Sequence, residues 1–211
     1  MGSPKTEPGH EGDETQHPET IAHPFYVMET QLTLEQYRAL LNAAPPDTEK
    51  DADPKIPAGI AYRDAVDNVL PALAKLAPAG WKLILIDRAR LEYAARAGVA
   101  TMTHGGDTPE DGAAYAWSKE NSENKVHPVA QKKPNAWGLY DTVGNRWHWH
   151  WVAGGGYGDT ATKYHIVYGG SYRDIVGGNG VRLANINVSN RPEGARYALL
   201  RADTPPPKGH P

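Results

Sequence analysis

The sequence contains no cysteine. This absence excludes disulfide bonds, thiol nucleophiles and thiolate metal sites, although it does not identify a cellular compartment. Phenylalanine is also scarce, with one residue against eleven tyrosines and six tryptophans. Tyrosine and tryptophan join a large apolar body to a polar group and are enriched at wet recognition surfaces. Some of them must also fill a core that is short of phenylalanine.

An excess of positive charge is missing as well. The formal net charge is -3, so there is no basic footprint, and we expect neither nucleic acid nor an anionic membrane as a partner. The best apolar stretch, residues 69–86, is interrupted by proline, glycine and lysine and is too broken for a transmembrane helix. The first residues are polar and acidic, and we expect no signal peptide in this chain.

Turn-forming residues, in contrast, are abundant. The 211 residues include 22 glycines and 18 prolines, which favours many loops on a compact scaffold over a helical bundle. A chain of this length is sufficient for one sizeable core. We predict one domain over residues 1–203, followed by a flexible, proline-rich tail over residues 204–211.

The first half of the chain predicts a strand and then two helices. Residues 26–32 alternate well enough for a strand. Thr33 and Gln36 have capping-box spacing at the start of a helix whose apolar residues share one face. Residues 62–76 show helical spacing again, and Pro71 should kink this second helix or end its first half.

A buried strand over residues 82–86 and a third helix come next. Asp87 is placed as the N-cap of that helix, and Gly98 marks its exit. From residue 99 onward, glycine-rich loops alternate with short strands. The expected fold class is therefore α+β: irregular and loop-rich, with two or three helices and short antiparallel strands. In such a design, loops usually carry the function.

Three segments in this order resemble the formylglycine-generating enzyme family. They are LEYAARAG (91–98), HPVAQKKPNAWGLYDTVGNRWHW (127–149) and VYGGSYRD (167–174). The resemblance covers almost the whole chain, and its specific part is NAWGLYDTVGNRWHW. It implies a sulfatase-modifying-factor domain built on a C-type-lectin-like fold.

The beginning of the chain departs from that family. The family has a Met-Gly-Ser after its first strand, and this sequence starts with Met-Gly-Ser, so that strand is missing from it. A sheet without its edge strand exposes unpaired backbone groups. We therefore expect another segment or a second chain to complete the sheet.

The sequence also departs from the family at the residues that carry its chemistry. Its enzymes oxidise a substrate cysteine with copper held by two cysteines after the Gly-Gly-Ser element. Here Asp174 and a residue near 178–179 stand at those positions. Without thiolates a soft Cu(I) site of that kind cannot form, so the parent reaction is not expected. The family also has Trp-Glu-Trp where this chain has His148 between two tryptophans, and arginine where it has Tyr168. A neutral hydrogen bond between His148 and Tyr168 could replace that ion pair.

The alternation of tryptophan and histidine over residues 147–151 has two interpretations. On a strand, His148 and His150 share one face and the tryptophans share the other. Either the tryptophans face the core and the histidines a polar pocket or solvent, or the histidine pair binds a transition metal. A metal site needs a third ligand, for which the sequence offers His104, His165 and Asp174.

Calcium is implied by the resemblance. Asp141 offers a carboxylate, and the backbone carbonyls of Thr142, Gly144 and Arg146 could complete an oxygen cage. Asn121 matches a second family position. The alternative is that Asp141 caps its own turn.

Three functions remain open. The first is a catalytically silent module that binds a small-molecule or protein ligand in a groove formed by late loops. Its candidate residues are Trp151, Tyr157, Tyr164, Tyr172, Arg173, Asn185, Asn187 and Asn190. The second is a cysteine-independent, metal-dependent oxidoreductase that uses His148, His150 and Asp174. The third is a regulatory subunit that pairs with an active relative.

Overall fold

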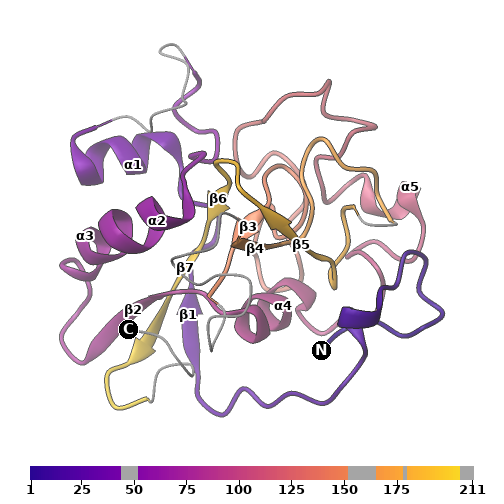
Figure 1. The fold of residues 1–211 in the computed structure, drawn as a ribbon, viewed down its shortest axis with the longest axis horizontal. Coiled ribbons are helices and arrows are strands. Elements are labelled where there is room, and N and C mark those ends of the chain that lie inside the picture. Colours follow the sequence, from indigo (N-terminus) through magenta and orange to yellow (C-terminus); the bar gives the residue numbers. More distant parts are fainter. Residues whose placement is uncertain (44–51, 152–164, 178–179, 205–211) are drawn as a thin grey trace.

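The computed structural model describes residues 1–43, 52–151, 165–177 and 180–204. Figure 1 shows helices α1 to α3 gathered on one side of the strands and α4 on the other. No helix in these ranges is long and apolar enough to cross a membrane. Except for Thr204, the predicted tail lies outside the described residues. So do Tyr157, Tyr164 and residues 178–179.

The described strands form two sheets joined by one stretch of chain. β1 (Phe25–Val27), β7 (Tyr197–Arg201) and β2 (Trp81–Leu85) form an antiparallel sheet in the order β1-β7-β2. The second sheet has the order β5-β4-β3-β6 and comprises β3 (His148–Trp149), β4 (His165–Tyr168), β5 (Ile186–Ser189) and β6 (Gly194–Ala195). Because a single residue separates β6 from β7, the same segment belongs to both sheets (Figure 1). With these helices and largely antiparallel sheets, the fold class is α+β, as predicted.

Helix α1 (Leu34–Leu41) begins at the capping box that the sequence predicts. The Thr33 hydroxyl accepts from the Gln36 backbone N–H at 3.3 Å, and the Gln36 side-chain oxygen accepts from the Thr33 N–H at 2.9 Å. Two N–H groups that the helix cannot pair internally are thereby satisfied. Leu34 and Tyr37 point into the core.

The second helical stretch is irregular just before Pro71. It consists of α2 (Tyr62–Asp64), a π-helical turn over Ala65–Val69 and α3 (Leu70–Ala74). A proline lacks an N–H, and its ring clashes with the carbonyl four residues earlier. The wider π-helical turn relieves that clash and lets the helix continue through the proline.

Helix α4 (Arg88–Arg96) is capped as predicted, since the Asp87 carboxylate accepts from the Arg90 N–H at 3.0 Å. Ala97 and Gly98 both have positive φ and end the helix. Two short helices were not expected: a 3-10 turn over Gly12–Glu14, and α5 (Pro109–Gly112), which has its own capping box.

The predicted strand over residues 26–32 is shorter than expected. β1 ends at Val27, and beyond it only separate backbone bonds follow the β6–β7 segment, such as Met28 N–H to the Tyr197 carbonyl at 3.1 Å. The carbonyls of Met28 and Glu29 turn instead to the guanidinium of Arg196. A distant side chain therefore interrupts the ladder.

The sheets are buried on both faces. One core cluster packs against α1 to α3 and includes Leu85, Trp147, Trp149 and Tyr197. The other packs against α4 and includes Ile84, Leu91, Val143 and Leu200. Successive residues of β2 therefore enter different cores, because side chains alternate across a strand.

Candidate functional site

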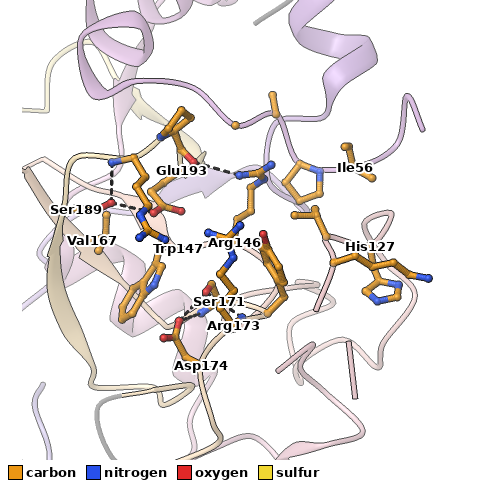
Figure 2. Close-up of a pocket in the computed structure, with 18 of the residues that line it drawn as sticks. Ile56, His127, Arg146, Trp147, Val167, Ser171, Arg173, Asp174, Ser189 and Glu193 are labelled. Atoms are coloured by element: carbon orange, nitrogen blue, oxygen red, sulfur yellow. Dashed lines mark hydrogen bonds between the residues drawn. The ribbon is translucent and has the colours of Figure 1, made fainter. Parts of the chain in front are cut away.

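The large pocket of the described structure lies where the late loops meet the segment after α1. Its volume is about 930 Å³, within the range typical of small-molecule sites. Figure 2 shows the lining side chains converging from several loops. The lining comes from residues 52–53, 56–59, 124–128, 146–147, 167, 171–174, 187 and 189–193, with Leu34.

Part of the predicted groove lies in this pocket. Tyr172, Arg173, Asn187 and Asn190 line it, as does Asp174, which was predicted as a catalytic or metal-binding residue. Two predicted groove residues lie elsewhere and do not line the pocket.

The two predicted groove residues outside the pocket, Asn185 and Trp151, support the fold. Asn185 is fully buried, and its side-chain amide donates to the Gly180 carbonyl, so it holds a loop. Trp151 is partly buried, and its backbone N–H donates to the Ile86 carbonyl at 2.9 Å. Asparagine and tryptophan in a sequence do not reveal whether they face a groove or the interior, because both roles use the same polar atoms.

Asp174, at a position that the resemblance assigns to a copper-binding cysteine, closes its own turn. One carboxylate oxygen accepts from the Ser171 N–H at 2.8 Å and from the Ser171 hydroxyl at 2.6 Å. The neighbouring Arg173 guanidinium lies over the Tyr172 ring at 4.9 Å. The side chain at this position therefore shapes the pocket wall.

Arg146 enters the pocket through its side chain. The sequence suggested its carbonyl as a calcium donor, but that carbonyl accepts from the Gln31 amide at 2.8 Å. The guanidinium Nη1 donates to the Pro192 carbonyl at 3.1 Å, and Nε is buried with no partner among the described residues. A Cβ at position 59 would lie 2.8 Å from Nη1, so Gly59 provides the space that this guanidinium occupies.

Glu193 also lines the pocket, and the sequence gave no sign of it. Its carboxylate accepts from the Ser189 hydroxyl at 2.9 Å. Burial raises the pKa of Glu193 to about 7, while the Ser189 bond and the positive charge of Arg146 act in the opposite direction. This carboxyl group therefore changes protonation state near neutral pH.

The pKa of Glu193 predicts how one substitution changes stability. A carboxyl whose pKa is raised in the folded state stabilises the fold at low pH, and that contribution is lost as pH rises through about 7. Glu193→Gln is expected to abolish this pH dependence. The free energy of unfolding of the variant, relative to that of the wild type, should therefore increase between pH 5 and pH 8. Urea unfolding at several pH values measures the difference. A constant difference across that range would contradict the assignment.

His148 and His150 lie in the interior and do not line the pocket. Both are buried, with 0% and 2% exposure, as are Trp147 and Trp149 on the opposite face. Burial lowers the pKa of His150 to about 4 and holds the pKa of His148 well below its usual value, which favours the neutral ring in both. The prediction that tryptophan faces the core is confirmed. The second face of β3 is covered too, because Tyr168, the register partner of His148, belongs to the core cluster that includes Leu91.

The proposed exchange of an ion pair for a hydrogen bond between His148 and Tyr168 is wrong. The two residues are register partners on β3 and β4. The Tyr168 hydroxyl, however, donates to the Leu183 carbonyl. The Tyr168 hydroxyl therefore forms no hydrogen bond with the His148 ring, which acts on the backbone of Tyr168 instead. The phenol is thus paired with a backbone acceptor and not with the imidazole.

The suggested third ligands for a transition metal are engaged elsewhere. His165 stacks on Tyr62 with ring centroids 4.2 Å apart, His104 shares a hydrogen bond with Thr142, and Asp174 caps its turn. Where the structure is described, no group of three or more histidine, aspartate or glutamate side chains is placed to hold a metal ion. A metal at the histidine pair stays a prediction.

Several of the oxygens predicted to bind calcium are already hydrogen-bonded. The Asn121 side-chain oxygen accepts from the Ser118 N–H at 2.9 Å, and the Arg146 carbonyl is bonded as described above. One carboxylate oxygen of Asp141 accepts from the Ala130 N–H at 2.8 Å, and the other is buried with no partner in the described part of the chain. Calcium takes six to eight oxygen ligands.

A buried arginine supplies positive charge beside Asp141. The Arg196 guanidinium donates to the carbonyls of Tyr140 at 2.6 Å and Asp141 at 3.3 Å, and to those of Met28 at 2.6 Å and Glu29 at 2.8 Å. Burial lowers its pKa to about 10, so it stays protonated at neutral pH. This cage of carbonyls fits the planar guanidinium. Calcium binding stays a prediction.

The comparison with known families agrees with this architecture. The profile of the sulfatase-modifying factor enzyme 1-like domain matches residues 1–198. The chain belongs to this family. The sulfatase-modifying factor domain thus accounts for nearly the whole sequence, as the three sequence segments indicated. A search of curated proteins returned no match.

Solved structures share the fold of this sulfatase-modifying factor domain. PvdO from Pseudomonas aeruginosa is 24% identical, with a TM-score of 0.74 over 95% of this chain and 90% of its own. Treponema denticola variable protein 1 is 19% identical, with a TM-score of 0.71 over 95% and 93%. CarF is 23% identical, with a TM-score of 0.63 over 96% of each chain. At these identities the likeness is one of fold.

Proposed function

We propose that this chain is a catalytically silent member of the sulfatase-modifying factor family that binds a ligand in the pocket at Arg146. The observation that carries the proposal is the state of Asp174. At a position where the resemblance places a copper ligand, the carboxylate is committed to Ser171 and shapes the wall of a 930 Å³ pocket. The scaffold of a catalytic groove is retained without its sulfur donors.

The alternative oxidoreductase has its candidate groups in two different places. His148 and His150 are buried in the interior, whereas Asp174 lines the pocket. A shared ligand set would require these groups to meet around one metal. The role of regulatory subunit, with a second chain completing the sheet, stays a prediction that does not depend on the pocket.

A peptide assay tests the silent state. Purified protein is incubated with copper, oxygen and cysteine-containing peptides, and mass spectrometry follows the peptides. We expect every cysteine to remain unconverted to formylglycine, because the chain offers no thiolate for copper. An active family enzyme serves as the control. Conversion catalysed by this chain would overturn the proposal.

A thermal-shift screen tests ligand binding. A ligand that binds only the folded chain raises the melting temperature in proportion to RT ln(1 + [L]/Kd). We expect at least one small molecule to stabilise the wild type and to lose its effect in Gly59→Ala. In that variant the new methyl group displaces the Arg146 guanidinium without removing charge. Equal shifts in both proteins would place the ligand outside this pocket.

A further inference from the structure

The pocket wall carries three arginines, two of which, Arg146 and Arg191, act electrostatically on the buried Glu193 carboxyl without forming an ion pair to it. Lys125 pairs with Glu123 at 2.6 Å. Within the described ranges, no carboxylate lies within 4 Å of the guanidinium of Arg146, Arg173 or Arg191. These three side chains come from separate loops and face the same cavity. Figure 2 shows Arg146 and Arg173 around the space drawn there.

The carboxylates of the same wall are held by their own loops. Asp53 accepts from the Lys55 N–H at 2.8 Å. Asp174 accepts from Ser171, and Glu193 from Ser189, as described above. These local hydrogen bonds keep each carboxylate in place without an ion pair to an arginine. Arg146 is partly buried, whereas Arg173 and Arg191 are exposed at the pocket wall. An incoming anion would gain charge-assisted hydrogen bonds from these guanidinium groups.

The lining also indicates the size and character of that anion. The arginines lie at residues 146, 173 and 191 around a 930 Å³ space, which is larger than a single inorganic oxyanion can span. The same lining includes apolar or aromatic groups, among them Trp147, Val167 and Tyr172. Such a surface packs against a carbon skeleton, while guanidinium forks match carboxylates.

We propose that the ligand is an organic polycarboxylate whose acid groups bind the guanidinium groups of Arg146, Arg173 and Arg191. This inference rests on the proposed function and names its ligand class. Arg146 is the inner anchor, because the space at Gly59 and the Pro192 carbonyl hold its guanidinium in place. Arg173 and Arg191 hold the other acid groups of the same molecule.

Calorimetry with named probes tests the inference on the full chain. Acetate, succinate, citrate, inorganic phosphate and glycerol are titrated at neutral pH and low salt. We expect affinity to rise from acetate to citrate, with phosphate weaker than citrate and glycerol not bound. Arg146→Gln and Arg173→Gln should each weaken citrate by about ten-fold or more, since each removes a charge-assisted contact. Gly59→Ala should weaken citrate as well, with its charge unchanged.

Arg201→Gln is the matched control, because this exposed arginine lies over Trp81 on the other sheet. It should leave citrate affinity within about two-fold of the wild type, as a distant surface charge acts weakly. Phosphate binding as tightly as citrate, or equal losses in Arg146→Gln and Arg201→Gln, would overturn the polycarboxylate assignment. Failure of all the acids, with an uncharged compound from the thermal-shift screen bound in the pocket, would overturn it while the proposed function stands. If the screen also yields no ligand, both fail.

Discussion

Replacing Arg196 with methionine is expected to lower the free energy of unfolding by about 3 to 5 kcal/mol, which is among the larger effects of a single substitution. The guanidinium is fully buried and donates to four carbonyls that join the end of β1 to the segment before Asp141. Methionine fills much of the volume but leaves these acceptors without donors and the Asp141 carboxylate without a nearby positive charge.

Urea and thermal unfolding measure this effect, with Arg201→Met, at the end of β7, as a control. The control removes an exposed arginine stacked on Trp81 and should cost less than about 1 kcal/mol. The melting temperature of Arg196→Met should fall by roughly 10 °C. Because Arg196 provides the local positive charge, a calcium chelator should shift the wild-type melting temperature by less than about 1 °C. A large chelator effect would show that calcium is bound after all.

Replacing Arg182 with methionine is expected to have an effect of similar size, about 3 to 5 kcal/mol, by freeing the N-terminal segment. The Arg182 side chain is fully buried and forms ion pairs with Glu7 at 2.8 Å and with Glu14 at 2.7 Å. It also donates to the Gly9 carbonyl at 2.8 Å. These bonds connect parts of the chain that are about 170 residues apart, and the variant leaves the buried Glu14 carboxylate without this cation.

A double-mutant cycle with Glu14→Gln separates the ion pair from the loss of packing. The double variant should be more stable than the sum of the single effects predicts, because the second substitution removes the uncompensated charge. Lys125→Met, which breaks the exposed pair with Glu123, is the matched control and should leave the free energy of unfolding almost unchanged. Limited proteolysis should cut Arg182→Met first in residues 1–22. Protection there equal to that of the wild type would contradict this role.

Local signals in the sequence were sufficient to predict where most of the helices begin. Capping at Thr33 and Asp87 depends on residues only three positions apart, so the spacing contains the required geometry. Pro71 was correctly read as a disturbance, although the π-helical turn before it was not foreseen. The family segments likewise indicated the fold, because their order and spacing are properties of the chain itself.

The candidate site was less accessible, since its parts meet only in three dimensions. Tyr172, Arg173 and Asp174 were found because they lie in a recognisable segment. Glu193, Arg191 and the side chain of Arg146 were missed, because nothing near them in sequence shows which way they face. The histidine pair misled for the same reason: alternation indicates opposite faces of a strand and does not say whether both are covered.

By itself, the sequence determined that no thiolate chemistry is available, where the principal helices begin and which scaffold the chain adopts. These properties depend on composition and on contacts within a few residues. The tertiary structure decided that Arg196 provides the positive charge beside Asp141, that Glu193 titrates near neutrality and that three arginines share one cavity. Burial, desolvation and long-range pairing set those properties, and they exist only once distant segments have packed together.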